Sequence, residues 1–322
     1  MNEHVPTVSV LMCVYNDENF VGHAIESILG QTFGDFEFVI VNDGSTDGTP
    51  GILAEYSAKD SRIRVFSQAN MGTTAAANFG LFAARSIYVA RLDSDDISYP
   101  HRLQTEVDFL ERYPHVALVG GGADIIDREG IIIGARNIRT TSPARTLTHR
   151  CIYQQSDVMF RRDMVVALGG YREKFRNAQD YDLWLRISEV ADIAKLNEVL
   201  GQWRLNGGGY TLSRAKEQDE EVRTIKRFAQ QRRSHGYDEY SAYLPLPPPK
   251  HRTNISEREY ELVVGRVMLQ AVRPREARVK FRNYLRTKTE LDAVFLYLLT
   301  FAQKFVIQSL FDFRSFYLNR LK

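Results

Sequence analysis

The feature that most constrains this chain is a set of short apolar runs, each of which ends in acidic and amide residues. Residues 8–14 (VSVLMCV) and 36–41 (FEFVIV) are continuous, β-branched and strand-sized, which is typical of buried parallel strands. Residues 87–92 form a similar run. Because parallel strands present their carboxyl ends at one edge of a sheet, the polar clusters that follow should converge there. The clusters are residues 16–18, 42–47 and 93–96.

Helical patterns separate these strands. Apolar residues recur at helical spacing after the first strand, at Phe20, Ala24, Ile25, Ile28 and Leu29. Thr49-Pro50 is a helix start, residues 64–67 read as a short strand, and residues 73–85 are an alanine-rich helix. This alternation predicts an α/β fold with a mainly parallel central sheet.

The charge of the chain is unevenly distributed. Residues 213–322 carry 22 Lys and Arg against 13 Asp and Glu, whereas residues 1–212 carry 20 against 27. A basic tail favours an anionic partner, either a membrane surface or a polyanionic glycan, and the alternative is a solvated helical surface. The two cysteines, Cys13 and Cys151, have no metal-ligand spacing, which fits a reducing, cytoplasmic compartment.

The glycine loops that usually hold phosphate are missing. No G-x-G-x-x-G follows the first strand, and G-x-x-x-x-G-K-[ST] does not occur. A diphosphate bound at this edge therefore needs another source of positive charge. Aspartates that hold Mg²⁺ or Mn²⁺ provide one, because these ions prefer oxygen ligands and bridge phosphate oxygens. Asp93-Ser94-Asp95 offers such ligands at a strand end; the alternative is a solvated, helix-capping turn.

Five motifs occur in a fixed order: VSVLMCVYNDE, VNDGSTDGT, NMGTTAAANFG, YVARLDSDD and QDYDLWLRI. On these motifs the chain resembles the glycosyltransferase family 2 enzymes of the GT-A fold, over roughly residues 7–210. The resemblance implies transfer of a sugar from a nucleotide-diphosphate sugar, with UDP-sugars as the commonest donors and Mn²⁺ or Mg²⁺ as cofactor. It also implies a nucleotide-sugar half at residues 1–115 and an acceptor half at residues 116–212.

The resemblance gives the loops after the first two strands a role in binding the nucleobase and ribose. The residues concerned are Tyr15, Asn16 and Glu18 in the first loop and Asp43 in the second. The Asp43 carboxylate would accept a hydrogen bond from the base. The alternative is that Asp43 forms an Asx-turn with Gly44.

Further positions follow from the later motifs. Asn70, Gly72 and Asn78 resemble the segment beside the nucleotide, where a structural role is an equal alternative. Asp93 and Asp95 would serve ribose and metal, with Asp95 as the direct metal ligand.

Asp180 matches the catalytic base of the family, and the alternative is a simple helix N-cap. The family usually has Glu-Asp where this chain has Gln179-Asp180. It often has histidine where Asn206 stands, which puts a metal or phosphate contact there in doubt. Arg204 is a further candidate phosphate contact.

The resemblance implies an inverting single displacement in which Asp180 takes the proton of an acceptor hydroxyl. Gln202-Trp203-Arg204 lacks the spacing of the Q-x-x-R-W motif of processive members, so addition of a single sugar to a glycan or lipid-linked acceptor is favoured. The rival hypotheses are a nucleotide-sugar pyrophosphorylase and an inactive nucleotide-sugar-binding protein. Nothing in the sequence suggests a nucleic-acid partner.

The mostly helical, basic extension at residues 213–322 follows the catalytic domain at residues 1–212. Within it, Pro245 and Pro247–Pro249 mark a linker. A basic segment at 273–288 precedes an aromatic-rich amphipathic helix, which is what a peripheral membrane anchor needs. The alternatives are a helical cap on the catalytic domain and a homodimer contact.

Overall fold

The computed structural model describes residues 4–206, 214–245, 255–271, 273–285, 291–302 and 307. The chain divides into two compact units. The first consists of Met1–Ala123, Asn137–Trp203 and Arg214–Pro248, and the second of Asp124–Arg136, Arg204–Ser213 and Pro249–Lys322. The proline linker from residue 246 onward and Gly207–Gly209 lie outside the described residues.

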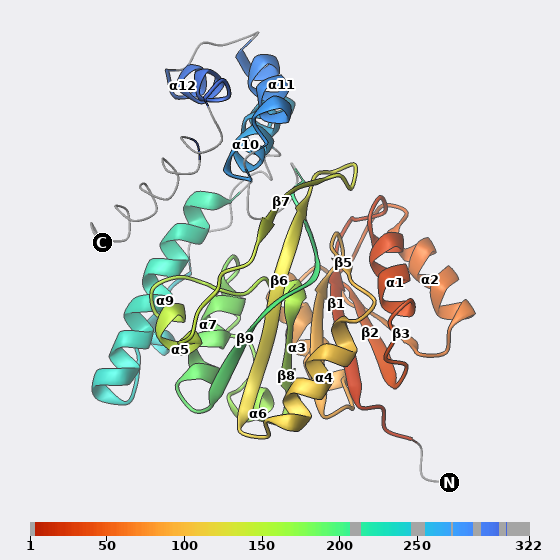
Figure 1. Ribbon diagram of the computed structural model, residues 1–322. Coiled ribbons are helices and arrows are strands. Elements are labelled where there is room, and N and C mark those ends of the chain that lie inside the picture. Colours follow the sequence, from red (N-terminus) through yellow and green to blue (C-terminus); the bar gives the residue numbers. More distant parts are fainter. Residues whose placement is uncertain are drawn as a thin grey trace. The chain divides into compact units, whose positions relative to one another are not determined.

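Four parallel strands form one half of the sheet, in the order β3-β2-β1-β4 (Figure 1). They are β1 (Val8–Val14), β2 (Phe36–Asn42), β3 (Ile63–Ser67) and β4 (Tyr88–Asp93). Every residue of β2 is buried, as its continuous apolar sequence predicts. All four carboxyl ends therefore meet at one edge, with the polar loops beyond them.

The other half of the sheet is antiparallel. β8 (Val158–Arg161) pairs in this way with β4 and with β6 (Val116–Ile126). The short β5 (Ile97–Ser98) pairs with β9 (Asp192–Arg204). The looser pattern of the sequence after residue 117 reflects this change of strand direction.

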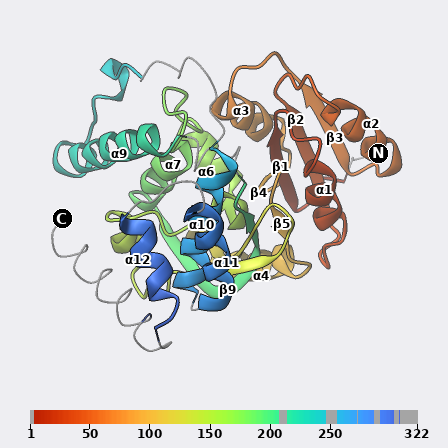
Figure 2. The ribbon, with the colours of Figure 1, turned by 90° about the horizontal axis from the view of Figure 1, so that it is seen from above.

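Helices cover both faces of the sheet in the first unit (Figure 2). Side chains alternate along β1, so that Val10 and Met12 join one core cluster while Leu11 joins the other. The first face carries α1 (Val21–Leu29), α2 (Thr49–Lys59) and α4 (Arg102–Arg112). The second carries α3 (Thr73–Ala83), α6 (Arg162–Ala167), α7 (Gln179–Ser188) and α9 (Ala215–His235).

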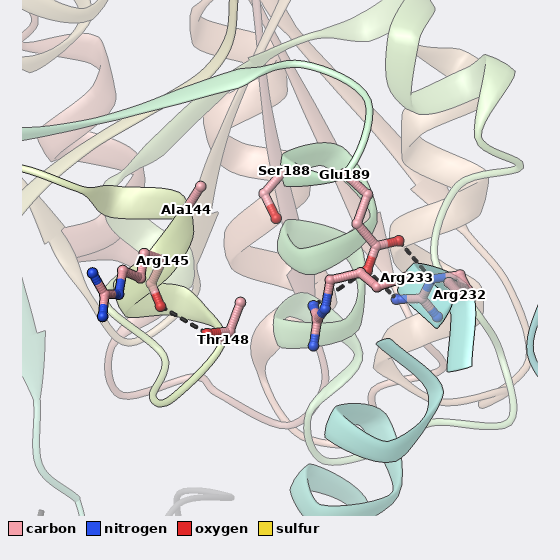
Figure 3. A pocket seen from close by; sticks show the side chains of 7 residues that line it. All are labelled: Ala144, Arg145, Thr148, Ser188, Glu189, Arg232 and Arg233. Carbon is pink, nitrogen blue, oxygen red and sulfur yellow. Dashed lines mark hydrogen bonds and ion pairs between the residues drawn. The ribbon is translucent and has the colours of Figure 1, made fainter. Parts of the chain in front are cut away.

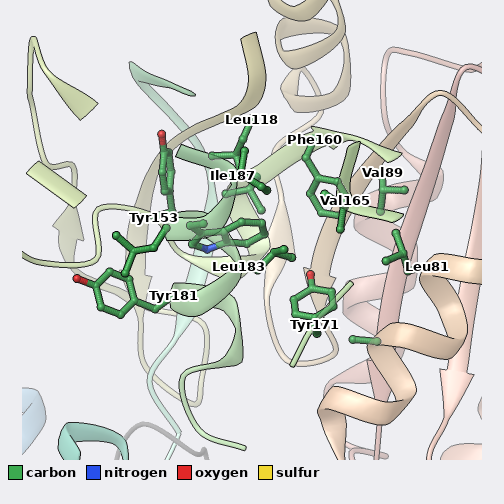
Figure 4. Packing of buried hydrophobic residues seen from close by; sticks show 14 of the residues in the cluster. Leu81, Val89, Leu118, Tyr153, Phe160, Val165, Tyr171, Tyr181, Leu183 and Ile187 are labelled. Atoms are coloured by element: carbon green, nitrogen blue, oxygen red, sulfur yellow. The ribbon is translucent and has the colours of Figure 1, made fainter. Parts of the chain in front are cut away.

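Figure 4 shows the core cluster of the second face, to which Phe160, Leu183 and Ile187 contribute. Leu183, Trp184 and Ile187 of α7 are fully buried, which confirms the inward stripe of that helix. Three short helices complete the first unit. They are α5 (Pro143–Leu147), η1 (Gln155–Asp157) and η2 (Tyr240–Ala242).

Within its described residues, the second unit contains β7 (Ile132–Arg136), which pairs with β6, and three helices. The helices are α10 (Glu257–Gln270), α11 (Pro274–Leu285) and α12 (Leu291–Leu299). Ser256 and Glu259 form a capping box that fixes the start of α10. A Cβ atom on Gly265 would lie 2.8 Å from the Phe281 ring, so glycine allows α10 and α11 to pack closely.

The α/β fold, its mainly parallel central sheet and its helical C-terminal region confirm the sequence prediction. None of the helices in the described ranges combines the length and the apolar composition that a bilayer crossing requires. The expected domain boundary at residue 212 differs from the compact units, because α9 belongs to the first of them.

Candidate active site

The loops that follow β1 and β2 are joined by hydrogen bonds. The Asn16 backbone N–H donates to Ser45 Oγ at 3.0 Å, and the Thr46 N–H donates to Asn16 Oδ1 at 2.7 Å. The Gly48 N–H donates to Glu18 Oε2 at 2.6 Å. Asn16 has a φ of 51°, a left-handed conformation that is uncommon outside glycine and concentrated at functional sites.

Asp17 connects these loops to the loop after β4. The Ser94 hydroxyl donates to Asp17 Oδ2 at 2.6 Å, while the Asp17 N–H donates to Thr49 Oγ1 at 2.9 Å. The polar clusters after β1, β2 and β4 therefore lie together at the carboxyl edge of the sheet, where the sequence places them.

The Asp43 carboxylate holds the loop that follows β3. Its oxygens accept hydrogen bonds from Gln68 Nε2 at 2.7 Å, from the Met71 N–H at 2.9 Å and from the Gly72 N–H at 2.8 Å. Gly44, at φ 75°, lies so close that a Cβ atom would be 2.8 Å from the Asn70 nitrogen. Asp43, Asn70 and Gly72 are thus neighbours, and Asp43 has a structural task whether or not it contacts a base.

Asn78 lies in α3 and holds the backbone of Tyr171 through two hydrogen bonds. Its Nδ2 donates to the Tyr171 carbonyl at 2.9 Å, and its Oδ1 accepts from the Tyr171 N–H at 2.8 Å. Asn78 is 9% exposed. These two bonds hold the backbone of Tyr171, so the structure supports the structural role for Asn78.

The Asp93 carboxylate lies at the end of β4, above η1. Its Oδ1 accepts from Gln155 Nε2 at 2.8 Å, and its N–H donates to Ser156 Oγ at 3.0 Å. Ser156 in turn donates to Asp96, which is buried. The Asp93 side chain remains 39% exposed. The buried Asp96 carboxylate instead holds Ser156, which accepts from the Asp93 N–H.

The acids present fit an ion that is shared with substrate. Within the described ranges, no three His, Cys, Asp or Glu side chains gather as a ready-made cage. Mg²⁺ and Mn²⁺ commonly bind through one or two carboxylates and take their other ligands from phosphate and water. Asp93 and Asp95, which are both part-exposed, suit that mode of binding.

A fully buried arginine lies beneath this loop. Arg91 donates to the Leu11 carbonyl at 3.0 Å, and its NH2 is 3.6 Å from Asp93 Oδ1. Burial lowers the pKa of Arg91, but the nearby Cys13, Tyr171 and Asp93 raise it above its ordinary value. The guanidinium therefore stays charged beside the Asp93 carboxylate.

Asp180 is the second residue of α7 and is half-buried. Its Oδ1 accepts from the Tyr181 N–H at 2.8 Å. The residues just before α7 are held by Glu221 of α9, whose carboxylate is 2% exposed. Glu221 accepts from the backbone N–H groups of residues 176–178 at 2.8–3.1 Å, and from Asn177 Nδ2 at 2.8 Å.

Tyr171 relates Asp180 to Asp93. Burial raises the pKa of the Tyr171 hydroxyl, the Arg91 charge opposes that rise, and the charges of Asp180 and Asp93 add to it. Both carboxylates therefore contribute to the electrostatic surroundings of one buried hydroxyl. Tyr171 packs in the core beside Trp184, with ring centroids 6.5 Å apart.

The other candidate residues are placed as follows. Tyr15 is 38% exposed in the loop after β1. Arg204 belongs to the second compact unit, where its NH1 donates to the Asp127 and Arg128 carbonyls at 3.1 Å. Its contact with phosphate stays a prediction.

Sequence reasoning missed Asp17, Arg91, Ser156 and Glu221. Asp17 stands inside the YNDE motif, so its position was a usable signal. Glu221 lies 41 residues after Asp180, and no pattern in the sequence connects the two.

The sheet carries three acidic loops at its carboxyl edge, and a carboxylate lies at the start of α7. This arrangement is typical of the GT-A class of nucleotide-sugar enzymes. The family model for glycosyl transferase family 2 matches residues 9–168. An uncharacterized glycosyltransferase of Haemophilus influenzae is 32% identical over 237 residues, 70% of this chain and 73% of that protein. The chain belongs to glycosyltransferase family 2.

Two further proteins are similar to this chain. Chondroitin synthase of Escherichia coli is 32% identical over 218 residues, which are 68% of this chain and 32% of that longer protein. The solved mannosyltransferase PcManGT of Pyrobaculum calidifontis, in complex with GDP-Man and Mn²⁺, aligns with a TM-score of 0.57 and 17% identity. That alignment covers 95% of this chain and 84% of the other, and it shows the shared fold.

Proposed function

We propose that this family 2 enzyme inverts the donor configuration and adds a single sugar from a nucleotide-diphosphate sugar to an acceptor hydroxyl. The observation that carries the proposal is the meeting of three polar loops at the carboxyl edge of the parallel strands, where Ser94 donates to Asp17 and Asp17 donates to Thr49. The likeness to chondroitin synthase supports a glycan acceptor. A lipid-linked acceptor is the alternative, and we place the reaction in the synthesis of a surface polysaccharide.

The donor would bind over the loops after β1, β2 and β4. Tyr15, Asn16, Glu18 and Asp43 would surround the nucleobase and ribose. Asp95 and Asp93 would hold Mn²⁺ or Mg²⁺, which in such sites neutralises charge on a diphosphate leaving group. The Mn²⁺ in the PcManGT complex supports this cofactor, while the base of the nucleotide stays a prediction, with uridine as the first candidate.

In the proposed reaction the Asp180 carboxylate removes the proton from the acceptor hydroxyl as that oxygen attacks the anomeric carbon. The new carbon–oxygen bond forms as the bond to the diphosphate breaks, so the nucleoside diphosphate leaves with the electron pair and the configuration inverts. Glu221 holds the segment before α7 and so fixes where Asp180 lies. Ser94 and Gln155 hold the loop after β4 in place, because Ser94 donates to Asp17 and Gln155 donates to Asp93.

The proposed site of action is the cytoplasmic face of a membrane. The apolar side chains of α12 and the basic residues of α11 would contact anionic lipid. The alternatives are that these helices pack as a cap on the catalytic domain or form a homodimer contact. Liposome flotation and sedimentation distinguish the three outcomes.

A thermal-shift panel tests donor binding directly. With Mn²⁺ present, one class of nucleotide sugar should raise the melting temperature, because a ligand that binds only the folded state stabilises it. Asp95→Ala should abolish the metal-dependent part of the shift while the melting temperature without ligand stays near that of the wild type. A panel of UDP- and GDP-sugars that produces no shift would contradict the proposed donor site.

A further inference from the structure

A cavity of about 420 Å³ lies at the C-terminal end of α7, whereas Asp180 belongs to the first turn of that helix. Figure 3 shows the side chains that line the cavity. The cavity is lined by side chains from three elements of the first compact unit. α5 and the residue after it contribute Arg145 and Thr148, the end of α7 contributes Ser188 and Glu189, and α9 contributes Arg232 and Arg233. Ser188 is eight residues beyond Asp180, which at a rise of 1.5 Å per residue is roughly 12 Å along the helix.

The single acid of the cavity is already occupied. Arg232 donates to both oxygens of Glu189, at 2.6 and 3.0 Å, and also to Asp238. Arg232, which is mostly buried, is thus balanced by two carboxylates. Arg233 is left with a distant contact, its NH1 being 3.9 Å from Glu189 Oε1.

Arg145 and Arg233 therefore carry positive charge that the cavity does not balance. The Arg145 guanidinium is exposed and makes no hydrogen bond or ion pair in the described part of the chain. The charge of Arg233 also acts on Tyr181 of α7: burial raises the pKa of the Tyr181 hydroxyl, and Arg233 opposes that rise. Lys226 adds positive charge nearby, since its Nζ donates to the His149 carbonyl.

Two guanidiniums from different elements, without an acid of their own, favour a ligand with at least two anionic oxygens. The planar fork of arginine matches carboxylate and phosphate oxygens, and such charge-assisted bonds are about twice as strong as neutral ones. The hydroxyls of Thr148 and Ser188 already donate to the Arg145 and Leu185 carbonyls. Recognition therefore depends on Arg145 and Arg233.

We propose that this cavity binds the carboxylate or phosphate group of an anionic saccharide, held between Arg145 and Arg233. As an acceptor subsite it rests on the proposed glycosyltransferase function, and it lies away from the donor loops. A ligand bound in the cavity would hold the C-terminal end of α7 in place. Asp180 lies at the N-terminal end of the same helix. An anionic acceptor would thereby bind more tightly than a neutral one of the same length.

Isothermal titration of the full chain at low salt tests this. The probes are a uronate oligosaccharide, its carboxyl-reduced neutral counterpart and inorganic phosphate. The double variant Arg145→Gln/Arg233→Gln should weaken binding of the charged probe about tenfold or more, as expected when two charge-assisted bonds are lost. Arg223→Gln is the matched control, because Arg223 is an exposed arginine of α9 outside the cavity. It should leave the affinity within about twofold.

Binding of either anion that depends on Arg145 and Arg233 supports the proposal and identifies the group that the cavity takes. Equal binding of the neutral probe, or an equal loss in Arg223→Gln, would overturn it, as would an unchanged double variant. Asp180→Asn should keep anion binding intact even though it lowers turnover. A chain without transferase activity that still binds the anion would therefore refute the proposed function alone.

Discussion

Asp180 and Asp182 lie two residues apart on α7 but have different surroundings. Asp182 is fully buried, accepts a hydrogen bond from Arg186 at 2.8 Å and has Arg172 at 3.7 Å. A carboxylate enclosed in this way cannot receive a proton from an acceptor hydroxyl. Asp180 is half-buried at the start of the helix, which leaves it as the candidate base.

We expect Asp180→Asn to lower kcat by about 10²–10⁴, because asparagine keeps the size and hydrogen bonding but cannot accept a proton. Donor affinity should change little. The measurement is steady-state turnover together with donor binding by calorimetry. Asp182→Asn is the control for stability, since breaking its buried pair should lower the melting temperature. Normal turnover in Asp180→Asn would place the base elsewhere.

Individual residues were predictable from the sequence where a motif fixes both the residue and its element. Asp93 and Asp180 fall at the end of a strand and at the start of a helix, as the sequence indicates. The sequence leaves the roles of Asp43 and Asn78 open, because hydrogen bonds to Met71 or Tyr171 depend on how loops fold together. Arg91 escaped notice because a buried arginine within an apolar strand has no pattern of its own.

At the scale of elements, α9 is more than a surface helix. Ile225 and Phe228 of α9 are buried in the same core cluster as Trp184. Glu221 reaches from this helix to the backbone before α7. Net charge and the proline linker place this segment in the extension, because neither signal reports which core a helix packs against.

Glu221→Gln should lower kcat by about tenfold and the melting temperature by several degrees. A glutamine has one accepting oxygen where the carboxylate offers two, so some of the buried N–H groups that Glu221 satisfies lose their partner. The donor KM should stay near that of the wild type, because the donor loops are untouched. Glu220→Gln, an exposed neighbour, is the matched control. A variant that is destabilised yet retains full kcat would show that Glu221 does not position Asp180.

For the whole molecule, the main question is what the second compact unit contacts. Phe295, Leu298 and Phe301 are 59%, 60% and 58% exposed in and just after α12. The Arg278 guanidinium of α11 lies 3.7 Å from the centroid of the Phe301 ring. Apolar side chains beside basic ones are suited to a lipid surface, and the aromatic residues 311–317 of the predicted anchor lie outside the described residues.

Flotation with anionic liposomes tests the membrane proposal. Full-length protein should float at low salt and be released as salt rises, because attraction to the lipid surface is screened. Deleting residues 290–322 should abolish flotation. If full-length protein stays unbound at low salt, or deletion changes nothing, the anchor proposal fails. Sedimentation of the same samples would then distinguish a homodimer contact from a cap.

Release of nucleoside diphosphate is the most direct test of the account as a whole. With a suitable donor, an acceptor and Mn²⁺ present, we predict that release and acceptor glycosylation rise together. Excess chelator should abolish both, and Mn²⁺ or Mg²⁺ should restore them. If donor binds but no diphosphate appears with any acceptor, the chain is a binding protein. Consumption of pyrophosphate with formation of nucleoside triphosphate would mark a pyrophosphorylase, and either result would contradict the proposed glycosyl transfer.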